Sequence, residues 1–314
     1  MKRYWTSELR SMVTEFQECK ERREICLASA FEDILELFSE HKQVLLEAIN
    51  SISIVDCCIS LYKASNMLGN IKCRPNFIEQ ENAYFRAREM RHPTASLSCS
   101  SFISNDIELG SVDSSNGSNF ILLTGANMGG KSTLLRQSSL LVLMAHIGMH
   151  VPATECTLTV VDQLFTRIGA NDNILQGKST FLVEMEETSK ILLNATNKSF
   201  VILDELGRGT STVDGSSIAF AVLDDLSKRC LGLFSTHYHQ LTEEFASSSN
   251  VRLMHMACEV GEQVIFLYKL QDGVCPKSYG TNVALMAGIS REIVEDAEKI
   301  QLSVVQEFKK LFKK

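Results

Sequence analysis

Several features that define other classes of protein are missing from this 314-residue sequence. No apolar run approaches the roughly 18 residues that cross a bilayer, and no apolar signal-peptide segment follows the charged start, so we expect an intracellular chain without a membrane span. The ten cysteines show no paired C-x-x-C spacing, which favours buried thiols over a disulfide framework. A net charge of -7 argues against strong nucleic-acid binding by these residues alone, because phosphate neutralisation needs clustered Lys and Arg.

Glycine and proline are both absent from residues 1–68, where apolar and charged residues alternate at helical spacing. This pattern predicts long helices, with a break near residues 50–53, whose short polar and β-branched side chains weaken a helix. Glycine and proline return at Gly69 and Pro75, so the sequence predicts a domain boundary at about residues 70–76. The last segment, residues 290–314, again has a helical pattern.

A different pattern, typical of an α/β domain, follows a polar surface loop at residues 110–118. Continuous apolar runs predict strands, and the segments between them predict helices. The strands are expected at 120–123, 200–203 and 231–234, and the helices at about 131–146, at about 180–194 and around Val222. Apolar strands separated by helices indicate a mainly parallel sheet that is covered on both faces. Residues 77–118 contain only short possible strands.

A glycine-rich segment directly after the first of these strands fits the phosphate-binding pattern G-x-x-x-x-G-K-S. It runs from Gly125 to Ser132 and is followed at once by a predicted helix, which is the context that the pattern requires. The glycines allow backbone N–H groups to turn towards phosphate oxygens, and the helix N-terminus adds positive potential. We expect Lys131 to neutralise the β- and γ-phosphates and Ser132 to ligate Mg²⁺.

Two adjacent acids provide the second half of such a site. Asp204 and Glu205 follow a predicted strand about 70 residues after the cradle, and two acids at a strand end are costly without a cation. We expect Asp204 to hold Mg²⁺ through water and Glu205 to orient and deprotonate the water that attacks the γ-phosphate. His237, after the third predicted strand, is expected to contact the γ-phosphate as a sensor or hydrogen-bond donor.

Four segments together resemble the ATPase domain of the MutS family, which lies within the ABC class of ATPases. They are TGANMGGKST at 124–133, STFLVEM at 179–185, DELGRGTST at 204–212 and STHYH at 235–239. The similarity extends from about residue 91 to about residue 297. Residues 252–258 and 275–280 resemble most the mismatch-recognising subunit of the eukaryotic MutSα heterodimer. One departure is Ala126, where the family usually has proline; the empty loop should be slightly looser, and activity should survive.

The resemblance implies a set of nucleotide-binding residues. Phe102 is implied to stack on the adenine, Asn105 to hydrogen-bond nearby and Tyr268 to cover the other face of the base, with core packing open as the alternative for Phe102 and Tyr268. The implied ATP-binding residues are Phe102, Ile103, Asn105, Gly125, Asn127, Met128, Gly129, Gly130, Lys131, Ser132, Thr133 and Tyr268. The resemblance also agrees with Ser132 and Asp204 as the Mg²⁺ residues and with Glu205 and His237 as the catalytic ones.

The resemblance also implies a dimer, because ABC-class ATPases hold ATP between the cradle of one subunit and the signature loop of its partner. Ser179 and Thr180 match that loop and are implied to act in trans, although as a local pattern they are an ordinary helix N-cap. The loop at 207–212 is implied to lie at the dimer junction. The partners implied are a second MutS-type subunit in a heterodimer, or alternatively a homodimer, a MutL-type protein, and DNA contacted through segments missing here. No membrane is implied.

We therefore expect an α/β P-loop NTPase of the ABC class with a mainly parallel sheet, preceded by an all-α helical segment and followed by a C-terminal helical region. The expected domains are 1–75, the end of the MutS core and lever region; 76–270, the ATPase domain; and 271–314, a helix-turn-helix dimerisation region. The resemblance implies ATP hydrolysis that drives conformational change of a mismatch-repair dimer, in the nucleus or, for a bacterial protein, in the cytoplasm.

Two other functions stay open. A nucleotide-gated dimerisation module would bind ATP with negligible hydrolysis, but the presence of Glu205 and His237 favours the enzyme. An SMC-like ATPase head would carry a long coiled coil between the two nucleotide motifs, where only about 70 residues lie here. The mismatch-reading segment, the connector and the clamp of complete family members precede this region, so we expect no mismatch specificity from these residues.

Overall fold

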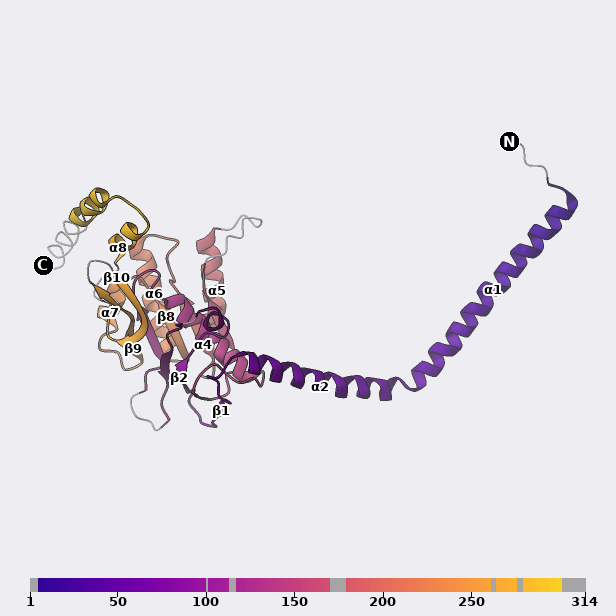
Figure 1. The fold of residues 1–314 in the computed structure, drawn as a ribbon, viewed down its shortest axis with the longest axis horizontal. Helices are drawn as coiled ribbons and strands as arrows, with labels where there is room; N and C mark the ends of the chain where they lie inside the picture. The colour runs from indigo at the N-terminus through magenta and orange to yellow at the C-terminus, as the bar shows by residue number, and fades with distance from the viewer. Residues whose placement is uncertain are drawn as a thin grey trace. The chain divides into compact units, whose positions relative to one another are not determined.

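The computed structural model describes residues 5–99, 101–112, 117–169, 179–260, 264–275 and 279–300. The chain divides into two compact units, of which the first ends at Tyr62 and the second begins at Lys63. The described part of the first unit is helical, whereas the second contains both helices and strands (Figure 1).

Two long helices, α1 (Ser7–Glu40) and α2 (Lys42–Met67), form the region without glycine and proline. The chain turns at His41, so the predicted break near residues 50–53 was wrong. The two serines of that segment stay helical because each hydroxyl donates to the carbonyl four residues earlier, at 2.8 Å.

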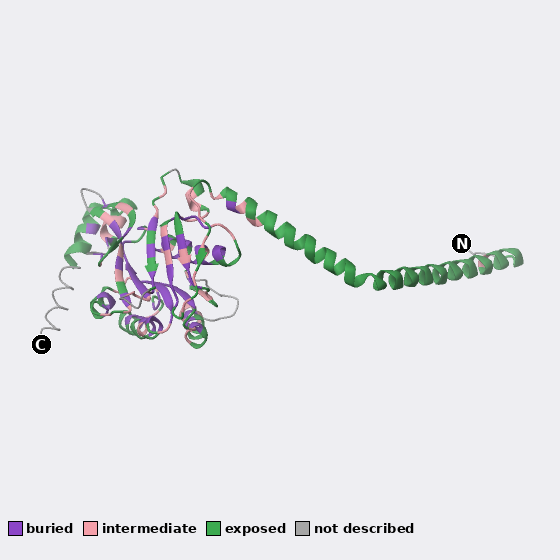
Figure 2. Ribbon diagram, turned by 90° about the horizontal axis from the view of Figure 1, so that it is seen from below, coloured by how far each residue is buried: buried purple, intermediate pink, exposed green. Residues whose placement is uncertain are grey.

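The side chains of α1 and α2 are almost all exposed, and Ser65 is the one buried residue in these two helices (Figure 2). By length and composition α2 could cross a membrane, with a mean hydropathy of 1.8 over an 18-residue window, contrary to our expectation. A search for an uninterrupted apolar run misses this helix because serines are spread among its apolar residues. One such helix is weak grounds for a membrane location, since core helices of soluble proteins pass the same test.

Among the described residues, a six-stranded sheet forms the centre of the second unit. Its order is β10–β9–β4–β8–β7–β6, and neighbouring strands are parallel except for β10, which pairs antiparallel with β9. The strands are β4 (Phe120–Thr124), β6 (Leu164–Arg167), β7 (Phe200–Asp204), β8 (Leu231–Ser235), β9 (Val251–Val260) and β10 (Val264–Asp272). The three strands predicted from apolar runs are confirmed as β4, β7 and β8.

Both faces of this sheet are buried, because alternate residues of each strand point to opposite sides. The helices that pack on these faces are α4 (Lys131–His146), α5 (Thr180–Asn194), α6 (Thr212–Ser227) and α7 (His239–Glu244). Ile121 and Leu123 of β4 pack in one core cluster with α4, whereas Phe120 and Leu122 pack in a second cluster with α5, α6 and α7. The limits of α4 and α5 agree with those predicted.

A smaller sheet, in the order β1–β5–β2–β3, contributes to the same core cluster as α4. Its strands are β1 (Asn76–Phe77), β2 (Phe85–Met90), β3 (Asn105–Leu109) and β5 (Glu155–Leu158). The short helices are α3 (Ala95–Ser98) and α8 (Gly280–Met286), and a helical segment at 291–300 follows. Residues 301–314 of the predicted C-terminal helix, and 113–116 of the predicted surface loop, lie outside the described residues.

The parallel strands β4, β8 and β7 are neighbours, so their carboxyl ends lie side by side. The N–H of Thr236 donates to the carbonyl of Leu123 at 3.1 Å, and the N–H of Glu205 donates to the carbonyl of Ser235 at 3.1 Å. These bonds hold together the loops that follow the three strands. Open parallel α/β sheets bind ligands at this edge, which is where the predicted motifs meet.

Candidate nucleotide-binding site

The loop between β4 and α4 turns through backbone conformations that favour glycine. Gly125, Met128 and Gly130 have φ angles of 144°, 67° and 95°. Gly130 is the N-cap of α4 and no side chain caps it, so the first N–H groups of the helix are available to an anion. A Cβ added at Gly130 would lie 3.2 Å from the ring of Tyr268, so an aromatic ring closes over the loop.

Lys131 reaches back across this loop and is only 5% exposed. Its ammonium donates to the carbonyl of Gly125 at 2.8 Å and to that of Ala126 at 3.2 Å. Burial lowers the pKa of Lys131, while the carboxylates of Glu205 and Asp204 oppose that change. A buried ammonium with neutral carbonyl partners is suited to a phosphate ligand, because a charged acceptor makes the stronger hydrogen bond.

Ser132 and Asp204 form a direct pair between α4 and β7. The Ser132 hydroxyl donates to Asp204 Oδ2 at 2.8 Å, and the Ser235 hydroxyl donates to Oδ1 of the same carboxylate. In the described part of the chain, no group of three or more His, Cys, Asp or Glu side chains could hold a metal ion. A hydroxyl beside a carboxylate nevertheless fits Mg²⁺, which keeps several waters and takes its remaining ligands from phosphates.

Glu205 follows β7 in a left-handed backbone conformation, with a φ of 55°. Its carboxylate contacts Nε2 of His237 and, at 2.8 Å, Nη1 of Arg208. The hydrogen bond from His237 lowers the pKa of Glu205 most, burial opposes this change, and the charges of Lys131 and Arg208 lower the pKa further. His237 thus faces Glu205, and its predicted contact with a γ-phosphate stays a prediction.

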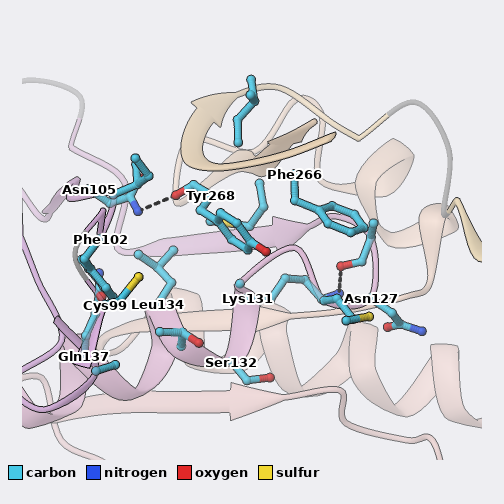
Figure 3. Close-up of a pocket in the computed structure, with 18 of the residues that line it drawn as sticks. Cys99, Phe102, Asn105, Asn127, Lys131, Ser132, Leu134, Gln137, Phe266 and Tyr268 are labelled. Carbon is cyan, nitrogen blue, oxygen red and sulfur yellow. Dashed lines mark hydrogen bonds between the residues drawn. The ribbon is translucent and has the colours of Figure 1, made fainter. Parts of the chain in front are cut away.

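One cavity of about 710 Å³ joins the loop, Glu205 and several aromatic side chains (Figure 3). Of the implied ATP-binding residues, it is lined by Phe102, Ile103, Asn105, Asn127, Met128, Gly130, Lys131, Ser132, Thr133 and Tyr268. Gly125 and Gly129 shape the loop without lining the cavity. In Figure 3 Asn127 and Phe102 lie at opposite ends. The "phosphate end" is residues 125–132 with Asp204 and Glu205. The "base end" is the part of the wall formed by Cys99, Ser101, Phe102, Ile103, Asn105, Leu134, Gln137 and Tyr268.

A buried asparagine supports the base end. Asn105 is 4% exposed; its Nδ2 donates to the carbonyl of Tyr268 at 3.0 Å, and its Oδ1 accepts from the N–H of Leu270 at 2.7 Å. These bonds hold a bulge of β10, in which Tyr268 has a φ of 53° and the register shifts after Phe266. Asn105 therefore positions Tyr268, and its predicted bond to the nucleotide stays a prediction. Tyr268 itself is 46% exposed, which argues against a role in the core.

Ser179 and Thr180 lie at the start of α5 and outside the cavity lining. The Ser179 hydroxyl accepts from the N–H of Leu182 at 3.2 Å, so this serine is a helix N-cap, as its local pattern indicates. Residues 170–178, immediately before it, lie outside the described residues. The predicted role of Ser179 and Thr180 in a partner's site stays a prediction.

A buried network behind Glu205 was not predicted. Glu184 of α5 pairs with Arg167 of β6 at 3.6 Å and also accepts from the N–H of Gly207 at 3.2 Å. The hydroxyl of Tyr238 donates to the carbonyl of Gly207 at 2.8 Å. The network therefore ties the first turns of α5 to the loop that follows Glu205. The sequence did contain a signal for this network. Glu184 lies at helical spacing from Thr188 and Ile191, the other buried residues of α5, and a buried acid requires a partner.

Comparison with known families agrees with this geometry. Residues 121–305 match the family described as MutS domain V, which is more than half of the chain. The chain belongs to the MutS family. The resemblance to the MutS family, first seen in four short segments, is thus confirmed over a continuous stretch that includes most of β4, the glycine-rich loop after it and both acids.

Curated MutS-family proteins align with nearly the whole chain. DNA mismatch repair protein Msh6 of Gallus gallus is 44% identical over 315 residues, and Msh6 of Homo sapiens is 40% identical over 315 residues; each alignment covers 95% of this chain. DNA mismatch repair protein MutS of Thermotoga maritima is 41% identical over 302 residues, also covering 95%. The chain spans 24%, 23% and 37% of the lengths of these three relatives, respectively.

Proposed function

We propose that this MutS-family chain binds and hydrolyses ATP, as a P-loop ATPase of the ABC class, within a DNA mismatch-repair protein. The observation that carries the proposal is the convergence of Lys131, Ser132 and Glu205 on one cavity, with Asp204 bonded to Ser132. The names of the relatives, which are DNA mismatch repair proteins, support the biological setting.

In this proposal the phosphate end binds the triphosphate. The N–H groups of the loop and of the first turn of α4 donate to phosphate oxygens, and Lys131 exchanges its bonds to two loop carbonyls for bonds to phosphate. Ser132 and Asp204 hold Mg²⁺, which when bound neutralises charge on the β- and γ-phosphates. The base occupies the other end, between Phe102 and Tyr268.

Hydrolysis in this proposal depends on Glu205. Water attacks the γ-phosphorus in line, a new P–O bond forms, and the bond to the β-phosphate oxygen breaks to leave ADP and phosphate. Glu205 orients that water and accepts a proton from it. Because His237 and Arg208 hold Glu205 in its ionised form, its carboxylate is a weak base, and positioning of the water contributes more than early proton removal.

The remaining parts of the proposal concern the assembled protein. Residues 1–75 belong to a helical lever region, 76–270 to the ATPase domain and 271–314 to a dimerisation region. A second MutS-type subunit receives Ser179 and Thr180 beside its own nucleotide, and hydrolysis drives conformational change while other segments contact mismatched DNA. A MutL-type partner is included, as is a nuclear location in a eukaryote or a cytoplasmic one in a bacterium.

A second candidate function is a nucleotide-gated dimerisation module with negligible hydrolysis. One observation favours it: both carboxylate oxygens of Glu205 are engaged, one by His237 and one by Arg208. A water bound by Glu205 must therefore share an oxygen with one of these contacts or displace it. ATP binding by the loop and Lys131 does not depend on this carboxylate.

The two functions are separated by the substitution Glu205→Gln, measured with and without a partner subunit. We expect ATP affinity to stay within about threefold and phosphate release to fall by about 100-fold, the lower range for loss of an acid–base group. Glu244→Gln, the same change at an exposed position on α7, is the matched control.

Two outcomes count against hydrolysis by this site. A wild-type chain that binds ATP but releases no phosphate at any partner concentration favours the gated module. Equal phosphate release by wild type and Glu205→Gln would show that another group activates the water. Failure of the wild type to bind ATP would reject both functions.

A further inference from the structure

Gln137, in the second turn of α4, carries a buried amide that lacks a partner. Its side chain is 1% exposed, and its Nε2 makes no hydrogen bond with any described residue. The same residue lines the cavity of about 710 Å³. Buried amide donors are nearly always satisfied in folded proteins, so an unpaired one facing a cavity points to a ligand or to water there.

The place of Gln137 in the cavity limits what that ligand can be. It follows Lys131 by six residues on the same helix, or about 9 Å along the axis at 1.5 Å per residue. Figure 3 draws it at the end of the cavity where Phe102 and Cys99 lie, away from Asn127. The lining residues there are mainly apolar, including Ile103 and Leu134. A phosphate group does not suit such a wall, whereas a flat heteroaromatic ring with a few polar atoms does.

The other candidate amide at this end is already used. Asn105 lines the cavity too, but its Nδ2 and its Oδ1 are both bonded to the backbone of β10. The Gln137 amide can donate to a ring nitrogen of a base and can accept from an exocyclic amino group, the pairing by which Gln recognises adenine in nucleic acids.

We propose that Gln137 is a specificity-determining residue whose amide donates to a ring nitrogen of the adenine base. The inference rests on the proposed function, because it takes the ligand of the cavity to be ATP. It makes base recognition a property of the same helix whose N-terminus receives the phosphates.

The test pairs one substitution in the protein with single-atom changes in the ligand. Binding of ATP and of 1-deaza-, 3-deaza- and 7-deaza-ATP, each of which lacks one ring nitrogen, is measured for wild type and Gln137→Leu. We expect Gln137→Leu to weaken ATP binding about threefold to tenfold, the range for one neutral hydrogen bond. One of the three analogues should bind wild type more weakly than ATP does, by a similar factor. The same analogue and ATP should bind Gln137→Leu with equal affinity.

Two controls separate recognition from damage to the fold. Inorganic tripolyphosphate should bind wild type and Gln137→Leu equally, because it occupies only the phosphate end. Gln163→Leu removes an exposed amide bonded to the carbonyl of Asn194 and should change no affinity. If Gln137→Leu fails to fold, Gln137→Glu keeps the shape of the side chain and replaces the donor by an acceptor, and it should weaken ATP more than tripolyphosphate.

The possible contradictions are distinct. If every analogue shows the same affinity ratio to ATP in wild type and variant, the inference is wrong and the proposed function stands. If tripolyphosphate binding falls as much as ATP binding in both Gln137 variants, the residue is structural and the inference is again wrong. If wild type binds no adenine nucleotide, the proposed function and the inference both fail.

Discussion

The two ends of the cavity are built in different ways. The phosphate end comes largely from one continuous stretch, residues 125–132, and its charged groups are paired: Lys131 with two carbonyls and Asp204 with two hydroxyls. The base end is assembled from segments far apart in the chain, and one of its buried polar groups, Nε2 of Gln137, has no partner among the described residues.

In the proposed function, the difference reflects what each end has to recognise. A triphosphate carries enough charge for a short loop, a helix N-terminus and one lysine to bind it. A base offers only weak, directional contacts, so its wall must be positioned by long-range bonds such as those of Asn105. Changes at the phosphate end should therefore abolish binding with little effect on the fold, whereas changes to the buried residues that position the base end should affect affinity and stability together.

The largest effect is expected from Lys131→Met. ATP affinity should fall by about 100-fold or more, because a buried cation that pairs with phosphate is lost. Thermal stability should change little, since a buried ammonium without an anion is itself unfavourable. Titration calorimetry and thermal unfolding measure the two effects. Lys228→Met, which removes an exposed pair with Asp224, is the control, and unchanged ATP affinity in Lys131→Met would contradict the comparison.

A smaller effect on affinity, with a larger one on stability, is expected from Asn105→Leu. Two hydrogen bonds to β10 are lost and the N–H of Leu270 stays buried without a partner, so the free energy of unfolding should fall by about 2 kcal/mol. ATP affinity should fall about tenfold as Tyr268 loses its support. Asn119→Leu, which removes a 2.9 Å bond to Ser227 away from the cavity, should reduce stability alone. Equal affinity losses in both variants would refute the assigned role.

The side chain of Tyr268 should contribute mainly to affinity. Because its ring is 46% exposed and closes over Gly130, Tyr268→Ala should leave stability nearly unchanged and weaken ATP binding about fivefold, the lower range for stacking of a base on an aromatic ring. Tyr268→Phe keeps the ring and should bind normally. A variant that loses stability but keeps its ATP affinity would support the core-packing alternative.

The smallest expected effect is on the pH dependence of stability, through the carboxylate of Asp106, which is next to Asn105 on β3. Burial raises the pKa of Asp106, but the N–H of Glu89 and the guanidinium of Arg88 outweigh it and hold the pKa below 3.8. A lowered pKa stabilises the fold above 3.8, and that contribution is lost as the pH falls through the lower value of the folded state.

Asp106→Asn should therefore cost less than about 1 kcal/mol at neutral pH, since this carboxylate is largely exposed. Urea unfolding over a range of pH measures the difference between wild type and variant. The difference should shrink below pH 3.8. If the difference in free energy of unfolding stays constant down to pH 2, the ionised carboxylate is not the group that stabilises this part of β3.

Several elements beside the cavity were predicted closely from the sequence, whereas one turn and one buried network were not, for different physical reasons. The apolar runs of β4, β7 and β8 are unambiguous because both faces of the sheet are buried. The turn at His41 was misplaced because helix propensity is weak and the serines of residues 50–53 bond to their own helix. The network around Glu184 was missed because pattern alone does not reveal the partner of a buried acid.

By itself the sequence determined the family, the middle strands of the sheet and the phosphate end. Conformations that favour glycine, a helix N-terminus and acids at a strand end all act among residues close in the chain, so their spacing is informative. The resemblance named Phe102, Asn105 and Tyr268, but only the tertiary structure decided how the base end is held together, where Asn105 meets the backbone of Tyr268 across a separation of 163 residues. Tertiary packing also decided that the amide of Gln137 is left without a partner, because burial and hydrogen bonding depend on every element around a side chain.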